Sequence, residues 1–458
     1  MRSVRALLIN PWIYDFAAYD LWSKPIGLLR IASCLKKAGV GVSLIDCLDR
    51  FHPRLQQDLG SKAPKSTVFG DGHYHSEPVE KPGVFRSIPR RFKRYGMPPG
   101  LFRALLAGES PDVVLVTSGM TYWYPGAFEA IRIVKEHFPS VPVLLGGIYA
   151  RLCPEHARRY SRADLVYAGS NIREVVELVG KLVGKDFDVA PAEAEDPDPA
   201  YELYPELHYI TLRTSSGCPF RCSYCGWYLL ENGFRQADPE RVFNLIKYFA
   251  GQKVKNFSFY DDALLYNAES HLVLILEKVI KSRLKVNFHT PNGLHVRFIT
   301  PGVARLLKRA GFVRPRLGLE TASAARQAET GGKVNNEEFL RAVKFLVGAG
   351  YSPGEIAANI MMGLPGQDFE EVKESIAFAA SAGVRVHLEE YSPVPGTPGF
   401  ARSGLPSDCD PLLHNNSAFP LYRPEDYYKF QELKDLARRL NRGEAARKDR
   451  VKWIKASP

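Results

Sequence analysis

Three cysteines in one short loop are the residues whose type and spacing most directly indicate chemistry. Cys218, Cys222 and Cys225 follow a CxxxCxxC pattern in the segment SGCPFRCSYCG. Three thiolates at this spacing can wrap one face of an iron-sulfur cube, which leaves one iron open for a substrate or cofactor. A structural zinc site is the alternative, but zinc requires a closed shell of four ligands, and no nearby histidine or fourth cysteine completes one. We therefore predict a 4Fe-4S cluster at these residues.

Carboxylates and glycines end three further segments that have the apolar character of buried strands. Asp261 and Asp262 close the segment NFSFYDD, Glu320 closes RLGLE, and the segment NIMMGLPGQ spans residues 359–367. In parallel α/β folds, ligands bind at the carboxyl ends of the strands. A pair of helix-capping aspartates on a solvated loop is the alternative for the first segment. Its position at a strand end favours function.

The second half of the chain predicts a partial barrel that presents these residues at one end. Buried strands alternate there with segments of helical spacing, and each strand is followed by a loop. Six βα units are two short of a complete barrel, and function is expected at the carboxyl ends of the strands. The predicted strands are 209–214, 256–260, 285–289, 316–320, 356–362 and 385–390.

The first half predicts a doubly wound α/β domain of the flavodoxin-like type. Strands alternate with helices through short turns, which favours a parallel sheet covered on both faces. The predicted strands are 6–10, 42–46, 113–118, 141–145 and 165–167. An acidic, proline-rich stretch follows and has the composition of a linker. The predicted parts are this domain at 1–185 with an insertion at about 50–110, a linker at 186–205, the barrel at 206–400 and a C-terminal helical extension at 401–458.

The cysteine loop resembles the signature of the radical S-adenosylmethionine (SAM) superfamily, including the aromatic residue before its last cysteine. This resemblance implies that the open iron binds the amino and carboxylate groups of SAM. An electron from the cluster then breaks the sulfonium bond and gives a 5'-deoxyadenosyl radical. The strand ends described above are similar to the SAM-binding segments of the family, as is EYSPVPGTP at 390–398. The SAM-binding residues implied are Tyr224, Asp261, Asp262, Glu320, Asn359, Met361, Gly363 and Tyr391.

The first domain resembles the cobalamin-binding domain found ahead of many radical SAM modules. The resemblance implies that the nucleotide tail of cobalamin passes Gly146 and Gly147, with Ser118 near the same edge. Glycine permits such close approach. The DxHxxG motif, whose histidine ligates cobalt from below, is absent, because the residues after Asp46 place His52 off its register. A vestigial domain that binds nothing is the alternative.

Two polar residues near the end of the third barrel strand are candidates to face a substrate. They are His289 and Asn292. An Asn-Gly turn that structures the loop is the alternative for the second of them. The remaining cysteines are isolated, and we expect them to act as small core residues without a catalytic role. They are Cys34, Cys47, Cys153 and Cys409.

Composition favours a globular protein: apolar residues make up 45% of the chain and charged residues 24%. The first apolar run is too short for a signal peptide and no stretch reaches the length of a membrane span, so we expect a cytoplasmic protein. The net charge of +11 includes basic clusters at 86–94 and 434–455. A nucleic-acid surface and a solvated face both fit these clusters. We favour the solvated face, because the sequence contains no dedicated RNA-binding motif.

Three functions are compatible with these features. The first is a cobalamin-dependent radical SAM methyltransferase that acts on an unactivated carbon, with SAM as methyl donor and radical source. The second is a radical SAM enzyme without cobalamin. The third is a non-enzymatic iron-sulfur protein, which the SAM-like strand ends oppose because an electron carrier needs no SAM pocket. We predict the first, with a small-molecule or peptide substrate and an electron donor such as flavodoxin or ferredoxin.

Overall fold

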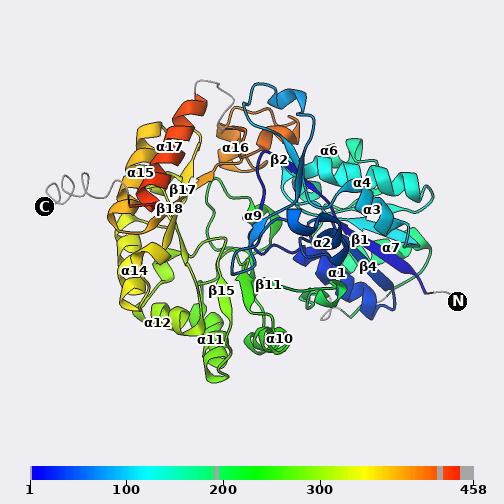
Figure 1. Cartoon of the computed structure of the whole chain (residues 1–458), viewed down its shortest axis with the longest axis horizontal. Coiled ribbons are helices and arrows are strands. Elements are labelled where there is room, and N and C mark those ends of the chain that lie inside the picture. Colours follow the sequence, from blue (N-terminus) through cyan, green and yellow to red (C-terminus); the bar gives the residue numbers. More distant parts are fainter. Residues whose placement is uncertain (1–2, 188, 191–194, 420–425, 444–458) are drawn as a thin grey trace, which may run out of the picture. The chain divides into compact units, whose positions relative to one another are not determined.

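The computed structural model divides the chain into two compact units (Figure 1). It describes residues 3–187, 189–190, 195–419 and 426–443. Unit 1 comprises residues 1–208 and 406–415, and unit 2 comprises residues 209–405 and 416–458. None of the helices in the described ranges combines the length and the apolar character that a membrane crossing requires.

Unit 1 is built on a parallel five-stranded sheet with the order β10-β9-β8-β1-β4. All of its strand pairs are parallel. In chain order this is the 2-1-3-4-5 arrangement of flavodoxin-like folds, so the predicted doubly wound fold is confirmed. The strands are β1 (Arg5–Asn10), β4 (Gly41–Asp46), β8 (Val113–Val116), β9 (Val143–Leu145) and β10 (Leu165–Val166).

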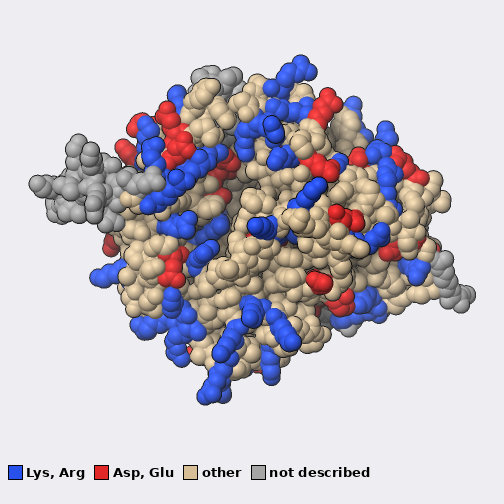
Figure 2. Space-filling view, viewed as in Figure 1, with Lys and Arg blue, Asp and Glu red and all other residues tan. Residues whose placement is uncertain are grey.

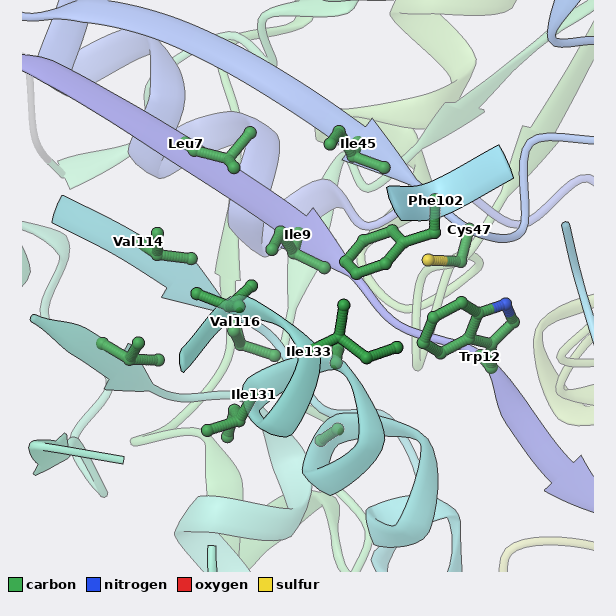
Figure 3. Packing of buried hydrophobic residues seen from close by; sticks show 14 of the residues in the cluster. Leu7, Ile9, Trp12, Ile45, Cys47, Phe102, Val114, Val116, Ile131 and Ile133 are labelled. Carbon is green, nitrogen blue, oxygen red and sulfur yellow. The ribbon is translucent and has the colours of Figure 1, made fainter. Parts of the chain in front are cut away.

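Strand β1, which lies between β8 and β4, buries side chains on both faces of this sheet. Leu7 and Ile9 join one apolar core (Figure 3), whereas Ala6 and Leu8 join a second core on the opposite face. This alternation follows from the two-residue period of a strand, and full burial of each leucine or isoleucine contributes about 1.5–3 kcal/mol. The first core is completed by α3 (Pro99–Leu106) and α4 (Tyr124–His137), and the second by α1 (Ile26–Lys37) and α7 (Ile172–Val183).

Short antiparallel strands and helices accompany the main sheet of unit 1. The strands are β2 (Ile13–Asp15), β6 (Ser76–Pro78) and β7 (Lys93–Tyr95) in one sheet, and β3 (Tyr19–Asp20) with β5 (Gly72–His73) in another. The helices are α2 (Pro53–Leu59), α5 (Ile148–Leu152) and α6 (Pro154–Tyr160).

The basic cluster at 86–94 takes part in contacts within unit 1. Arg94 forms an ion pair with Glu77, and the guanidinium of Arg90 lies 5.5 Å from the ring centroid of Phe16. Figure 2 shows lysine and arginine side chains spread over the visible face, with acidic side chains between many of them. The residues of the basic tail from 444 onward lie outside the described residues.

The boundary between the units lies after residue 208, later than the predicted linker at 186–205. The backbone nitrogen of Ala200 donates to the carbonyl oxygen of Leu29 at 3.1 Å, and the Tyr204 hydroxyl donates to Asp46 at 2.5 Å. These contacts attach the end of the linker to unit 1. The predicted extension at 401–458 is divided between both units, because residues 406–415 belong to unit 1.

Unit 2 contains the six predicted parallel strands in two three-stranded sheets, β11-β14-β15 and β16-β17-β18. Isolated bridges between Phe288 and Phe312 and between Leu294 and Leu317 continue the pairing beyond these sheets. The predicted partial barrel of six βα units is therefore confirmed. The strands are β11 (Tyr209–Leu212), β14 (Asn256–Phe259), β15 (Asn287–His289), β16 (Arg316–Glu320), β17 (Ala357–Met362) and β18 (Arg385–Glu390), with the short antiparallel pair β12 (Ser215–Ser216) and β13 (Arg235–Gln236).

Helices follow the strands of unit 2 in the order that the alternation predicts. They are α9 (Trp227–Leu230), α10 (Pro239–Gly251), α11 (Leu272–Lys281), α12 (Pro301–Ala310), α13 (Ala324–Glu329), α14 (Asn336–Gly348), α15 (Phe369–Ser381) and α16 (Pro398–Arg402). A last helix, α17 (Asp426–Asn441), packs against β18. The Asn441 side chain accepts from the backbone nitrogen of Val386 and donates to its carbonyl oxygen, at 2.8 and 2.9 Å.

Candidate active site

The three cysteines of the CxxxCxxC loop lie between β12 and α9. Gly217 precedes them with φ of 78°, and a Cβ there would lie 2.0 Å from the carbonyl oxygen of Gly233. Only glycine fits this position. Cys222 is buried, Cys218 and Cys225 are half-buried, and all three thiols are free. The loop therefore presents three unbridged thiols at the carboxyl end of the first barrel strand.

Two later turns of unit 2 hold this loop in place. The backbone nitrogen of Ser223 donates to the carbonyl oxygen of Thr330 at 3.2 Å, and that of Gly399 donates to the carbonyl oxygen of Ser223 at 2.7 Å. Gly331 packs so closely that a Cβ there would lie 3.2 Å from Cα of Cys222. The position of the thiols thus depends on segments that follow β16 and β18.

Asp261, at the carboxyl end of β14, anchors the start of the cysteine loop. Its Oδ1 accepts hydrogen bonds from the backbone nitrogen and the hydroxyl of Thr214, at 3.0 and 2.8 Å, and from the hydroxyl of Ser215 at 2.6 Å. Burial raises the pKa of this carboxyl, and the hydrogen bonds oppose the rise. Its other oxygen, Oδ2, is buried and has no hydrogen-bond partner among the described residues.

Asp262 lies beside the same loop and keeps one oxygen available. Its Oδ2 accepts from the backbone nitrogen of Gly217 at 3.2 Å and lies 3.9 Å from the guanidinium of Arg213. Its Oδ1 is buried and has no partner in the described part of the chain. Burial raises the pKa of Asp262 to about 7, although Arg213 opposes this rise. A cationic group at Oδ1 would compensate the cost of burying this carboxylate.

Glu320, at the end of β16, forms an ion pair with a lysine that the sequence analysis did not identify. Nζ of Lys333 lies 2.8 Å from Oε1 of Glu320 and 5.6 Å from the ring centroid of Tyr224. Glu320 has φ of 65°, and the register between β16 and β17 shifts there. Burial raises the pKa of all three thiols of the cysteine loop, and the charge of Lys333 opposes this rise. A single lysine in a polar turn has no distinctive pattern, so no sequence signal pointed to it.

The structure places two of the predicted residues, Met361 at the end of β17 and Tyr391 directly after β18, beside Tyr224 of the cysteine loop. Met361 and Tyr391 form an apolar cluster against which Tyr224 packs. Gly363 directly follows β17 and has φ of 86°. Asn359 is buried, and neither its Oδ1 nor the hydroxyl of Tyr391 has a hydrogen-bond partner within the described ranges. Buried acceptors of this kind are typical of a polar ligand site.

The two candidate substrate-facing residues lie at the same end of unit 2. Nε2 of His289 lies 3.1 Å from Oδ1 of Asn256. The Asn292 side chain donates to the carbonyl oxygens of Tyr260 and Asp261, at 3.1 and 3.4 Å. Asn292 thus stabilises the turn that carries the aspartate pair.

The carboxyl edge of the unit 1 sheet contains the three residues predicted to contact cobalamin. The hydroxyl of Ser118 donates to the carbonyl oxygen of Gly146 at 2.6 Å. Gly147 has φ of 93°, and a Cβ there would lie 2.3 Å from the carbonyl oxygen of Ser118. A Cβ on Gly146 would meet no atom within 4 Å. Position 147 therefore requires glycine because Ser118 lies too close for a Cβ, whereas Gly146 faces open space.

Residues 212–379 match the family model of the Radical SAM superfamily. The matched stretch begins at the last residue of β11, includes the cysteine loop and ends within α15. Unit 2 contains a radical SAM domain. The resemblance inferred from the cysteine loop is therefore confirmed.

The residues of this radical SAM domain fit the two groups that its family uses, a 4Fe-4S cluster and SAM. Each cysteine ligand of an iron-sulfur cube binds a different iron, and the loop supplies three free thiols. Among the described residues, no three His, Cys, Asp or Glu side chains are placed to hold a single metal ion. Asp262 and Asn359 add buried oxygens without partners in the described ranges, as an amino group or a hydroxyl of SAM would need.

Curated relatives of this chain include an uncharacterized methyltransferase of Pyrococcus horikoshii. It is 25% identical over 321 residues, which are 63% of this chain and 68% of the relative. The threonylcarbamoyladenosine tRNA methylthiotransferase MtaB of Thermotoga maritima is 23% identical over 60% of this chain and 64% of its own length. The match with MtaB thus spans less than two thirds of that protein.

Two solved structures share the fold of this chain at low sequence identity. The radical SAM methyltransferase TsrM from Kitasatospora setae has a TM-score of 0.62 at 16% identity, over 87% of this chain and 75% of TsrM. The cobalamin-dependent SAM radical enzyme OxsB has a TM-score of 0.55 at 16% identity, over 92% of this chain and 56% of OxsB. At such identities the likeness concerns the fold.

Proposed function

We propose that this chain is a cobalamin-dependent radical SAM methyltransferase that acts on an unactivated carbon. The observation that carries the proposal is a fold likeness to TsrM and OxsB over 87% and 92% of this chain, more than the radical SAM domain alone. Both proteins have been solved with cobalamin bound. An uncharacterized methyltransferase and a hopanoid C-2 methylase among the curated relatives support the same reaction class.

The radical site would be built from side chains that the barrel gathers at one end. A bound cluster and SAM would supply radical chemistry that begins with removal of a hydrogen atom from the substrate. Cys218, Cys222 and Cys225 would hold the cluster through their thiolates. Asp262 would accept a hydrogen bond from the methionine amino group at Oδ1, which has no partner among the described residues, while the backbone nitrogen of Gly217 holds Oδ2.

Further residues would orient SAM by their packing and hydrogen bonds. Tyr224, Met361 and Tyr391 would form the apolar wall of the site. The buried Oδ1 of Asn359 would accept from a hydroxyl or amino group. Glu320, held by Lys333, would face the ribose or the amino group of SAM. We also assign His289 and Asn292 to the substrate side of the site.

The cobalamin site would lie at the carboxyl edge of the unit 1 sheet. Bound cobalamin supplies a cobalt centre that can relay a methyl group between SAM and the substrate. Gly146 faces open space there and would allow close approach of the nucleotide tail. Ser118 would fix the glycine pair through its bond to the Gly146 carbonyl oxygen. His52 occupies the N-cap position of α2 and would not be a cobalt ligand.

The proposed reaction requires a substrate and an electron donor. We propose a small-molecule or peptide substrate and a low-potential electron donor such as flavodoxin or ferredoxin. A nucleic-acid substrate is not favoured, because the basic residues Arg90 and Arg94 take part in contacts within unit 1.

The test is to incubate the anaerobically reconstituted protein with SAM, a reductant and methylcobalamin, with and without candidate substrates. Both 5'-deoxyadenosine and S-adenosylhomocysteine are then quantified. We expect both products, with S-adenosylhomocysteine dependent on cobalamin. Formation of 5'-deoxyadenosine without S-adenosylhomocysteine, unaffected by cobalamin, would contradict the methyltransferase proposal and favour a radical SAM enzyme without cobalamin.

A further inference from the structure

An arginine on α13 binds the backbone of the loop that follows β17. Nη1 of Arg326 donates to the carbonyl oxygen of Pro365 at 3.2 Å, and Nη2 donates to that of Gly366 at 2.6 Å. The same guanidinium pairs with Glu371 of α15, with Nη2 3.0 Å from Oε2. The side chains of Arg326 and Glu371 are only 11% and 13% exposed. One side chain thus joins two helices to the loop at 363–367.

The carboxylate of Glu371 extends this network to the turn that follows β16. Its Oε1 accepts a hydrogen bond from the hydroxyl of Thr321 at 2.9 Å, and Thr321 directly follows Glu320. The hydroxyl of Ser375, one turn later on α15, accepts from the backbone nitrogen of Ala322 at 2.8 Å. The pair formed by Arg326 and Glu371 therefore connects the turn after Glu320 to the loop after β17.

The loop after β17 needs an external support to keep one conformation. Gly363 and Gly366 have φ of 86° and 75°, and glycines have the largest backbone freedom to lose on ordering. Gln367 supports the loop from inside, because its side chain accepts from Leu364 and donates to Met361, both at 3.2 Å. The two loop carbonyls bound by Arg326 receive a planar, charged donor that a lysine cannot reproduce.

We infer that Arg326, through its pair with Glu371, is a positioning residue for SAM binding. It fixes the loop at 363–367 relative to Glu320, and it does not itself contact SAM. This inference rests on the proposed assignment of Glu320 and Gly363 to the SAM site. A substitution far from the reacting atoms that displaces a bound reactant by about 1 Å can lower the reaction rate by about a hundredfold.

Removal of the Arg326 guanidinium should leave the cysteine loop intact. The cysteine loop is held by the backbone of Thr330, which in turn donates to the carbonyl oxygen of Arg326. Substitution of the Arg326 side chain retains both backbone contacts. SAM affinity should therefore fall in these variants, while cluster content stays unchanged.

The test compares Arg326→Gln, Arg326→Lys and Glu371→Gln with the wild-type protein after anaerobic reconstitution. Arg94→Lys is the matched control, because Arg94 also pairs with a glutamate and is 16% exposed, but lies in unit 1. Iron and sulfide content and the thermal midpoint report on the cluster and the fold. The SAM dissociation constant is measured by titration, and the change of the reduced-cluster EPR signal on SAM addition reports on its placement.

We expect Arg326→Gln and Glu371→Gln to raise the SAM dissociation constant about tenfold or more, with cluster content unchanged. Arg326→Lys should bind SAM more weakly than wild type, and Arg94→Lys should match wild type. Unchanged SAM affinity in both neutral variants would overturn the inference. If Arg326→Gln fails to fold, wild-type SAM affinity in Arg326→Lys would overturn it. A wild-type protein that binds a cluster but no SAM would instead refute the proposed function.

Discussion

The ammonium of Lys333 lies 2.8 Å from the carboxylate of Glu320, and this ion pair lies beside the cysteine loop. Both side chains are largely buried, at 18% and 13% exposure. Removal of one partner leaves the other charge partly desolvated, which is costly. The pair is therefore expected to matter for stability as well as for SAM binding.

We predict that Lys333→Gln lowers the free energy of unfolding by about 2 kcal/mol, because a charged hydrogen bond in a largely buried site is lost. The variant should also bind SAM more weakly than wild type. Chemical denaturation and SAM titration measure the two effects. Lys278→Gln is the control, because Lys278 pairs with Glu240 in an exposed position and should change stability by less than about 0.5 kcal/mol. Equal stability of both variants would refute this prediction.

Substitution of the three loop cysteines by alanine should abolish the cluster. We predict that the Cys218→Ala, Cys222→Ala, Cys225→Ala triple variant contains no iron-sulfur absorbance after reconstitution and cleaves no SAM. Cys409→Ala is the control, because Cys409 lies in unit 1 and should leave a cluster of about four irons per chain. Cluster absorbance and SAM cleavage in the triple variant would exclude these residues as ligands.

The raised pKa of Asp262, about 7, predicts that SAM affinity depends on pH. Below this pKa the carboxyl is neutral and accepts a hydrogen bond from the iron-bound SAM amino group only weakly, so SAM affinity should rise about tenfold between pH 6 and pH 8. The free energy of unfolding of the protein without SAM should change in the opposite direction and fall as pH rises. Because the folded pKa is raised above the unfolded value, the contribution of this group to stability is lost as pH rises through 7.

Titration of SAM binding between pH 6 and pH 8 measures this dependence. Asp262→Asn should bind SAM more weakly at pH 8 and should show a flat profile. If this variant keeps the pH dependence of the wild type, another group is responsible.

The glycine pair of unit 1 predicts two different outcomes for one added methyl group. Gly147→Ala would place Cβ 2.3 Å from the Ser118 carbonyl oxygen at φ of 93°, so it should destabilise unit 1 by several kcal/mol. Gly146→Ala meets open space and should leave stability within about 0.5 kcal/mol of wild type. Thermal denaturation measures both. If cobalamin passes Gly146, its binding to Gly146→Ala should be weakened, and wild-type cobalamin affinity there would argue against this path.

The parts of the fold that the sequence predicted correctly share one property. The barrel strands other than β18 are runs of mostly buried residues that end at a polar or glycine-rich loop. All six strands start within two residues of the predicted positions, as with β14 at Asn256 and β18 at Arg385. The cysteine spacing likewise predicts a radical SAM signature without reference to the rest of the chain, and the matched family model includes this loop. Such features can be predicted from the sequence because they depend on residues that are neighbours along the chain.

The features that sequence analysis missed depend on contacts between distant segments. Lys333 reaches Glu320 across a turn, and Arg326 reaches Glu371 on a different helix. Neither basic residue has a spacing that distinguishes it from a solvated lysine or arginine. The close approach of Ser118 to position 147, which by itself requires glycine there, is a further contact of this kind. Tertiary neighbours of this kind cannot be read from local sequence.

The return of residues 406–415 to unit 1 makes the two units inseparable by a single cut. The Asn415 side chain donates to the buried carboxylate of Asp15 at 3.0 Å, and the His414 ring lies 3.0 Å from the hydroxyl of Thr121. A fragment that ends at residue 208 would leave Asp15 without one of its hydrogen-bond donors in a buried position. An experiment that excises unit 1, exchanges it or cleaves the chain must therefore treat unit 1 as a discontinuous domain. Its last segment, residues 406–415, follows the barrel in the sequence.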